Sequence, residues 1–414
     1  MNIYKILLGA LSIPIVFYIA LQSFRNKDYP FFLQRLAIRF TRIKEPKNKS
    51  IWIHAASVGE VNAATPLIHK LAVHNNIILT TNTPSSAIRV ANTLSEQVIH
   101  CYCPIDWQWA VRKFISKFKP HCLLIIETEL WPNLFTVASA LKLPVTIING
   151  RISTRTLHAS AWMKKRYWDC LQTCHFVLTR SKEDSQRFIA LGASASKVKT
   201  VGNIKFYPQH NVNDLTAFKT HQPYVLAAST RDDEEALIVA AWIQSEHGEQ
   251  LLIIVPRHPK RIEDIINQLK PYNLKIAIRS RNDTITVETD VYIADTFGEL
   301  MTFIKGATFV IMGGSFVDKG GQNILEVAHA GKTVVFGPFM DNFKEEALLF
   351  VEQQAGIQVG NNKLLSETIN KLLNQPEINQ QYQNNASQLM AQQQTVLDTY
   401  LLELQQLYPD INWI

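Results

Sequence analysis

The sequence predicts an α/β protein in which two doubly wound, Rossmann-like domains follow an N-terminal transmembrane helix. Three observations predict this fold class. The chain has 414 residues, enough for two α/β domains that each bury a core. In both halves, short apolar runs rich in β-branched residues alternate with longer helical patterns, which is typical of βαβ units. The first 24 residues form a separate apolar segment.

Residues 6–24 of that segment carry no charge, and a helix of this length is about long enough to cross a bilayer core of about 30 Å. Pro14 is compatible with such a helix, because transmembrane helices contain proline more often than soluble ones. A cleaved signal peptide is the main alternative, but residues 21–25 offer no small-x-small cleavage site. We therefore expect a retained membrane anchor over residues 1–24.

Residues 25–49 form a basic flank with eight Lys and Arg side chains against two acidic ones. The positive-inside rule places such a flank in the cytoplasm, and the same charges can bind anionic head groups. A solvated linker is the alternative. We expect a single-pass protein of the inner membrane, with its domains on the cytoplasmic face and the anionic membrane surface as a partner. The basic residues are Arg25, Lys27, Arg35, Arg39, Arg42, Lys44, Lys47 and Lys49.

The formal net charge is +7, from 42 basic and 35 acidic residues. This excess suits an anionic partner, but charge alone does not distinguish nucleic acid, phospholipid and a phosphorylated substrate. The five cysteines are an odd number in a long chain, which indicates a reducing compartment rather than a disulfide framework. Cys101 and Cys103 lie in a predicted strand, so a metal site is not expected there.

The alternation of strands and helices occurs twice, on either side of the polar stretch 207–222, which we interpret as a linker. The expected domains are therefore 25–206 and 223–414. In doubly wound folds, ligands bind beyond the carboxyl ends of the strands. The predicted strands are 51–54, 77–80, 98–103, 123–126, 145–148 and 176–179 in the first half, and 224–228, 251–255, 291–294, 309–312 and 334–336 in the second.

Glu60 is the first candidate for chemistry, because it follows the first predicted strand at the start of a helix. An acidic residue in the first turn also stabilises a helix through the macrodipole, and spacing alone favours that structural role. The functional alternative is a general base at the mouth of the site.

Glu127 and Glu129 follow the apolar strand 122–126, in the segment Glu-Thr-Glu-Leu-Trp-Pro-Asn. Two acids two residues apart share one face of an extended segment. A solvated turn before a helix at Pro132 is the alternative, but a buried strand that runs directly into two carboxylates is costly without a function. We therefore expect a site at this strand end.

Cationic and glycine-rich segments follow other strands. Arg257 comes directly after the strand 251–255, where a guanidinium group can bind phosphate, and Lys205 is a second candidate cation. The glycines of residues 313–321 permit close approach of a ligand before a helix. Asn323 and Glu326 fit an N-cap and its partner three residues on, so capping alone could explain that pair. The chain has no Asp-x-Asp pair, no zinc spacing and no Gly-x-Ser-x-Gly elbow.

These segments together resemble the Kdo transferases, enzymes that add 3-deoxy-D-manno-octulosonic acid to the lipid A precursor. The similar stretches lie in order across nearly the whole chain, and ETELWPN and the run at 313–326 are the most specific. They are WIHAASVGE (52–60), ETELWPN (127–133), NGRIS (149–153), GNIKF (202–206), AAST (227–230), VPRHP (255–259), DTFGEL (295–300), GGSFVDKGGQNILE (313–326) and GPFMDNF (337–343).

The resemblance implies a GT-B glycosyltransferase fold, with an N-terminal acceptor domain and a C-terminal domain that binds CMP-Kdo. It implies Glu60 as the catalytic base, and Glu127 and Lys205 as the transition-state-stabilising acid and lysine. It implies no cofactor and no metal, and as partners CMP-Kdo and the lipid A precursor, but no nucleic acid. The implied CMP contacts are Pro256, Arg257, Phe297, Gly298, Glu299, Asn323, Ile324, Leu325 and Glu326.

Two positions depart from the family pattern. Gln322 stands where the family usually has His, which puts in doubt a proton or phosphate role for that side chain. Phe297 stands where Met is common. Two other functions remain to be weighed: a nucleotide-sugar 2-epimerase of the same architecture, and a non-catalytic lipid-binding protein. The anchor and basic flank argue against the first, and Glu60, Glu127, Lys205 and Arg257 together argue against the second.

Overall fold

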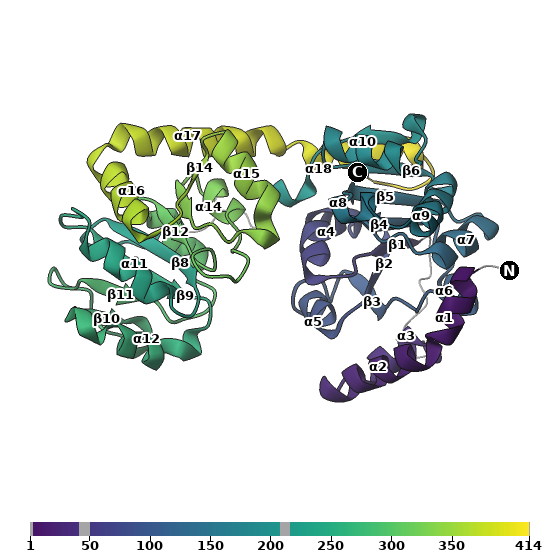
Figure 1. Cartoon of the computed structure of the whole chain (residues 1–414), viewed down its shortest axis with the longest axis horizontal. Helices are drawn as coiled ribbons and strands as arrows, with labels where there is room; N and C mark the ends of the chain where they lie inside the picture. The colour runs from purple at the N-terminus through teal and green to yellow at the C-terminus, as the bar shows by residue number, and fades with distance from the viewer. Residues whose placement is uncertain (1–2, 41–49, 208–215, 414) are drawn as a thin grey trace. The chain divides into compact units, whose positions relative to one another are not determined.

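The structure is a computed structural model that describes residues 3–40, 50–207 and 216–413. The chain divides by its contacts into two compact units (Figure 1). The first unit is Met1–Gln209 with Thr395–Ile414, and the second is His210–Gln394. The chain thus returns to the first unit at its C-terminus, whereas the sequence predicts a second domain that continues to residue 414. Residues 41–49 of the basic flank and 208–215 of the predicted linker lie outside the described residues.

The apolar N-terminal segment forms two helices. α1 (Ile3–Ala10) and α2 (Ser12–Arg25) are separated at Leu11. Pro14 explains the break, because it offers no N–H to the Ala10 carbonyl and its ring crowds that carbonyl. The prediction of one continuous helix over residues 6–24 is therefore wrong. Within the described ranges, no helix has the length and apolar character needed to span a membrane.

The helices α2 and α3 (Tyr29–Arg35) pack against the first sheet. Ile19 of α2 and Phe31 of α3 are buried in one cluster with Tyr102 and Ile105. Asp28 caps α3 by accepting from the Phe31 N–H at 3.1 Å, and the Tyr102 hydroxyl donates to the same carboxylate. Because this packing removes apolar surface from water, it stabilises the N-terminal helices on the domain.

The first unit contains a seven-stranded parallel sheet of order β3-β2-β1-β4-β5-β6-β7. This is the doubly wound order, in which the chain moves first to one side of β1 and then to the other. The strands are β1 (Ser50–His54), β2 (Asn76–Thr81), β3 (Val98–Tyr102), β4 (Cys122–Ile126), β5 (Val145–Gly150), β6 (Phe176–Thr179) and β7 (Val198–Thr200).

Helices cover both faces of this sheet because successive side chains of each strand point to opposite sides. In β1, Ile51 and Ile53 join one core, whereas Trp52 joins the other. The first core is covered by α4 (Val58–Leu71), α5 (Pro84–Thr93) and α18 (Val396–Leu407), and the second by α6 (Gln108–Phe118), α7 (Pro132–Ala140) and α9 (Ala161–Thr173). Two further helices are α8 (Thr154–Leu157) and α10 (Lys182–Ala190).

The C-terminal helix α18 is an integral part of the first core, and Figure 1 shows it in yellow against the first sheet. Tyr400 is fully buried, and its hydroxyl donates to the Gly202 carbonyl at 2.9 Å. Gly202 itself has a φ of +127°, and a Cβ atom there would lie 2.9 Å from Val396. The segment that carries Lys205 is therefore packed directly against α18.

The second unit contains another seven-stranded parallel sheet, of order β10-β11-β9-β8-β12-β13-β14. Its strands are β8 (Tyr224–Thr230), β9 (Leu251–Pro256), β10 (Ile276–Ile278), β11 (Val291–Ile293), β12 (Val310–Met312), β13 (Val334–Phe336) and β14 (Gly356–Gln358). Its helices are α11 (Glu234–Ile243), α12 (Ile262–Leu269), α13 (Leu300–Gly306), α14 (Leu325–His329), α15 (Lys344–Glu352), α16 (Asn362–Asn374) and α17 (Pro376–Gln393).

Each sheet has a point where the strand order reverses. In the first sheet it lies between β1 and β4, and in the second between β8 and β12. Loops that leave such neighbouring strands diverge to opposite faces and leave a crevice at the carboxyl edge. Most of the sequence segments singled out for chemistry follow these strands or their neighbours, whereas Lys205 follows β7 and residues 297–299 follow β11.

Candidate active site

The acidic candidates of the first unit gather at its switch point. Glu60 lies six residues after the end of β1, in the first turn of α4, and Glu127 and Glu129 follow the end of β4. Because β1 and β4 are hydrogen-bonded neighbours, their following loops meet at one edge. The acidic residues that the sequence selects therefore lie at one edge of the first sheet.

Glu60 forms a capping box with Ser57. The Ser57 hydroxyl accepts from the Glu60 N–H at 3.3 Å and donates to its carboxylate at 3.1 Å, and the Ala56 N–H donates to the same carboxylate at 2.6 Å. The side chain is half-buried. Burial raises its pKa to about 7, with further increases from Glu129 and Glu127 and opposing effects of His54 and the Ala56 N–H. The carboxylate that caps α4 therefore also has a pKa near neutrality.

Glu127 adopts a left-handed backbone conformation, with a φ of +61°. This conformation costs a non-glycine residue on the order of 1–2 kcal/mol. It directs the carboxylate towards two cations: Lys205 Nζ lies 2.8 Å from Oε1, and Arg151 lies 3.5 Å from Oε2. The predicted pair of Glu127 and Lys205 is thus in direct contact.

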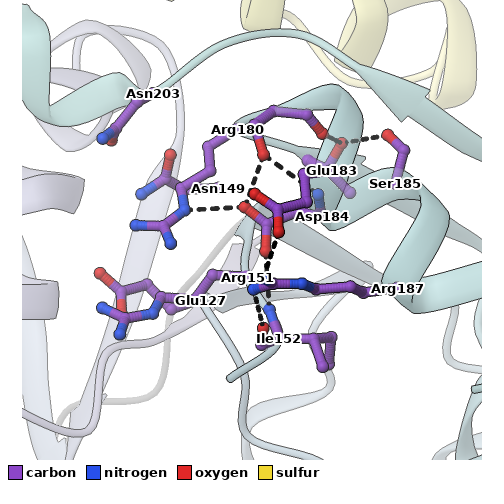
Figure 2. A network of polar contacts seen from close by, with 12 residues as sticks. Glu127, Asn149, Arg151, Ile152, Arg180, Glu183, Asp184, Ser185, Arg187 and Asn203 are labelled. Carbon is purple, nitrogen blue, oxygen red and sulfur yellow. Dashed lines mark hydrogen bonds and ion pairs between the residues drawn. The ribbon is translucent and has the colours of Figure 1, made fainter. Parts of the chain in front are cut away.

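Buried polar contacts hold these cations in place. The Asn149 side chain accepts from the Ile204 N–H at 3.1 Å, and Asn203 accepts from the Lys205 N–H at 3.1 Å. Figure 2 shows that the Arg180 side chain extends towards the side of this network where Asn149, Asn203 and Glu127 lie.

Asp184 of α10 anchors the same network. Its carboxylate accepts from the Arg180 Nε at 2.9 Å and from the Ile152 N–H at 2.9 Å (Figure 2). Arg187 donates to the Ile152 carbonyl at 2.8 Å. Both backbone polar groups of Ile152 are therefore hydrogen-bonded, and this fixes the loop that carries Arg151.

Glu129 lies near a buried histidine that the sequence prediction did not select. His54 ends β1 and is fully buried, and its Nε2 lies 3.9 Å from a Glu129 oxygen. The indole N–H of Trp131 also donates to Glu129. His54 stands at the end of the sequence segment Trp-Ile-His. A lone histidine in an apolar strand does not reveal, from sequence alone, a partner that follows another strand.

In the second unit, cationic groups follow β8 and β9. Arg257, directly after β9, is exposed, and its N–H donates to the Thr230 carbonyl at 2.9 Å, which fixes its backbone. Arg231, after β8, contacts His258 at 2.8 Å. Arg261 is bound by the buried Glu235 at 3.0 Å. Arg257 and Arg231 thus place positive charge beyond the carboxyl ends of the two strands.

The glycine-rich loop after β12 donates its N–H groups to a carboxylate of the same unit. Glu234, at the start of α11, is fully buried and accepts from the N–H groups of Gly314, Ser315 and Phe316 at 2.6–3.0 Å. Gly313 is required for close approach, because a Cβ atom there would lie 2.5 Å from the Thr230 Cα. The backbone donors of this loop therefore bind Glu234, and neither Glu234 nor Glu235 was selected from the sequence.

The remaining predicted nucleotide contacts follow β11 and β12. Glu299 is paired with Arg279, whose Nε lies 2.6 Å from it. Asn323 donates to Glu326 at 3.0 Å and accepts from the Leu325 N–H at 3.2 Å, so these contacts are local to the start of α14, whose N-cap residue is Ile324. The other predicted contacts are Pro256 at the end of β9, the exposed Phe297, Gly298 with a φ of +86°, and the buried Ile324 and Leu325. Gln322, which departs from the family pattern, lies against Gly314.

Comparisons with known proteins find similar sequences over most of the chain. A family model for 3-deoxy-D-manno-octulosonic-acid transferase (kdotransferase) matches residues 34–207. The 3-deoxy-D-manno-octulosonic acid transferase of Rickettsia typhi is 34% identical over 366 residues, which cover 85% of this chain and 78% of that protein. The enzyme of the same name from Haemophilus influenzae is 31% identical over 401 residues, which cover 92% and 93%.

A solved glycosyltransferase structure from Rickettsia africae matches the fold with a TM-score of 0.58 at 12% identity, and covers 87% of this chain and 99% of its own. Two parallel-sheet, Rossmann-like units of the GT-B kind are thus shared with that enzyme. Identity above 30% along most of two relatives is the stronger evidence. The chain belongs to the 3-deoxy-D-manno-octulosonic acid transferase family, and it is a glycosyltransferase.

Proposed function

We propose that the protein transfers Kdo from CMP-Kdo to the tetraacyldisaccharide 1,4'-bisphosphate precursor of lipid A, in lipopolysaccharide core biosynthesis. The reaction inverts the anomeric centre and needs no metal or cofactor. The observation that carries the proposal is the group formed by Glu60, Glu127 and Lys205 at the switch point of the first sheet, in a chain of this family.

Glu60 is the proposed general base. A hydroxyl group of the acceptor attacks the anomeric carbon of Kdo, a new C–O bond forms, and Glu60 takes the hydroxyl proton. The bond between the anomeric carbon and the phosphate oxygen breaks, and its electron pair leaves with CMP. The raised pKa of Glu60, about 7, supports this role, because a base works best when its pKa lies near the working pH.

Glu127 and Lys205 are the proposed transition-state-stabilising residues. The anomeric carbon becomes electron-poor as CMP leaves, and a fixed carboxylate stabilises that positive charge. Lys205 and Arg151 hold the Glu127 carboxylate in one orientation. The left-handed conformation of Glu127 supports a functional role, since strained residues cluster at active sites.

The second unit is the proposed donor domain. Arg257 would bind the CMP phosphate through a charge-assisted hydrogen bond, and Pro256 would line the base or ribose. Residues 297–299 and 323–326 would complete the nucleotide contacts. Glu299 and Glu326 each have a side-chain partner, Arg279 and Asn323, which orients their carboxylates.

We further propose that the N-terminal helices contact the cytoplasmic face of the inner membrane. Large apolar side chains of α2, including Ile13, Phe17 and Phe24, are 69–83% exposed. An apolar helix face followed by basic residues is typical of interfacial attachment to anionic lipid. Such attachment would keep the first unit near a lipid acceptor, without the transmembrane helix expected from hydropathy.

The product of one incubation tests the function. The purified chain is mixed with CMP-Kdo and the tetraacyl acceptor in detergent, and the lipid is analysed by mass spectrometry. A lipid whose mass has increased by one or more Kdo residues, with CMP released, is expected. CMP release without a change in lipid mass would refute the assigned acceptor.

A further inference from the structure

His54 is a buried histidine with one ring nitrogen that has no hydrogen-bond partner among the described residues. Its side chain is fully buried at the end of β1. Nδ1 lies 2.9 Å from the Thr80 hydroxyl, whereas Nε2 makes no hydrogen bond. An unpaired buried polar group is costly, so Nε2 requires an account.

The hydrogen-bond partners of Thr80 allow both ring nitrogens of His54 to carry hydrogen. The Thr80 oxygen accepts from the Trp52 indole N–H at 2.8 Å and lies 3.5 Å from the Ile53 carbonyl, to which it can donate. Its second lone pair can then accept from Nδ1 of His54. Protonated His54 would satisfy every group around Thr80 and would direct its Nε2–H at Glu129, 3.9 Å away.

Glu129 is held at the end of β4 with its carboxylate facing His54. The Trp131 indole donates to it, and its side chain is 21% exposed. Burial alone would raise the pKa of Glu129, but His54, Trp131 and the half-buried Arg35 hold the pKa below its usual value. The pKa of His54 would be lowered by burial, but its neighbours Cys103 and Glu129 raise it to about 10.

We propose that protonated His54 and ionised Glu129 form an ion pair near the proposed catalytic base, and that these two positioning residues set how readily Glu60 takes up a proton. The proposal rests on the proposed function of Glu60. It assigns a role to the Glu129 carboxylate, which neither caps a helix nor belongs to a strand. It also gives the unpaired Nε2 of His54 a charged partner.

The expected effects of removing each charge have opposite signs. The titratable groups that face Glu60 are His54 of β1 and Glu127 and Glu129 after β4. A negative neighbour raises the pKa of a carboxyl group and a positive neighbour lowers it. Removing Glu129 takes away the negative neighbour with the largest effect on Glu60 and lowers the pKa of Glu60, whereas removing His54 leaves Glu129 unpaired and raises it.

The pH dependence of kcat/KM for Kdo transfer measures this effect, because the base must be deprotonated in the free enzyme. In the wild-type chain, activity should rise with pH through about 7. The acid limb should move to lower pH by roughly one unit in Glu129→Gln and to higher pH by a similar amount in His54→Gln. The double variant has neither charge, so its limb should return to near the wild-type position.

A charge change at an exposed site is the control. Glu96 lies in the turn after α5 and is exposed, so Glu96→Gln should leave the limb unmoved. If one single variant fails to fold, the other single variant and the double variant still show in which direction the acid limb moves. In the wild-type chain, ¹⁵N NMR of labelled histidine measures the protonation state of the His54 ring directly.

The outcomes separate the two proposals. Lack of Kdo transfer by the wild-type chain would refute the proposed function. If all variants transfer Kdo and their acid limbs lie at the same pH, only the ion pair is refuted. A purely structural role of His54 and Glu129 would lower the rate without moving the acid limb. A His54 imidazole that is neutral at pH 7 in the NMR titration would also overturn it.

Discussion

Glu127 shows at the scale of a single residue how the site departs from relaxed backbone geometry. It follows the predicted strand β4, and the sequence marks its carboxylate as functional. Its φ of +61° was not predictable, because a glutamate gives no sequence signal for the left-handed region. The conformation turns the side chain from the strand direction towards Lys205 and Arg151.

A matched pair of variants tests this strain. Glu127→Gly and Glu127→Ala both remove the carboxylate, but only alanine retains a Cβ atom at a positive φ. The glycine variant should therefore be more stable than the alanine variant by about 1 kcal/mol, measured by urea unfolding. Both should lose most of their turnover. A more stable alanine variant would show that the backbone of residue 127 relaxes without strain.

Arg257 carries the donor prediction at this scale. Arg257→Ala should weaken CMP binding by about 1.5–3 kcal/mol, the usual contribution of a hydrogen bond to a charged group, as measured by calorimetry. Lys260 is an exposed cation three residues further on, and Lys260→Ala is the control expected to change CMP affinity little. Equal losses in both variants would indicate only a general effect of positive charge.

Among the elements, the central strands were predictable and three strands at the sheet edges were not. The predicted strands coincide with β1–β6, β8, β9 and β11–β13 within one or two residues. The missed strands β7, β10 and β14 have three residues each and lie at edges of the two sheets. An edge strand is covered on fewer sides, so it needs no long apolar run and leaves little trace in the sequence.

The N-terminal helices show where hydropathy alone misleads. A run of apolar residues predicts a spanning helix, but hydropathy does not register that Pro14 interrupts the hydrogen bonding or that one side of α2 packs on the protein. Ile19 is 3% exposed and Ile13 is 82% exposed in the same helix.

Two substitutions in α2 test this packing. Ile19→Ala should lower the free energy of unfolding by about 2–4 kcal/mol, because it leaves a cavity against Phe31 and Tyr102. Ile13→Ala should change it by less than about 0.5 kcal/mol. Both values come from denaturant unfolding in detergent-free buffer. Equal, small effects would mean that α2 does not pack on the first sheet.

At the scale of the whole molecule, the proposed function assigns one half of the chemistry to each unit. The family resemblance indicated the role of each unit, and the structure adds the contacts that position Glu127, Lys205 and Glu60. Residues such as His54, Asn149 and Glu234 could not be selected from the sequence, because their partners lie on strands or loops distant along the chain. Pairing between distant segments is what a single sequence does not display.

Metal independence is a prediction about the whole reaction. The proposed donor is a sugar monophosphate ester, which needs no metal-bridged diphosphate, and the sequence has no Asp-x-Asp pair. An excess of EDTA should therefore leave the rate of Kdo transfer unchanged within about twofold. A rate abolished by EDTA and restored by magnesium would contradict the leaving-group argument.

The central claim is that Glu60 removes the acceptor proton. Glu60→Gln preserves shape and can still accept from the Ala56 N–H, but it cannot take up a proton. Turnover with CMP-Kdo and the tetraacyl acceptor should fall on the order of 10²–10⁴-fold, whereas CMP affinity and unfolding should stay near wild type. A Glu60→Gln chain that keeps more than about a tenth of wild-type turnover would show that Glu60 only caps α4.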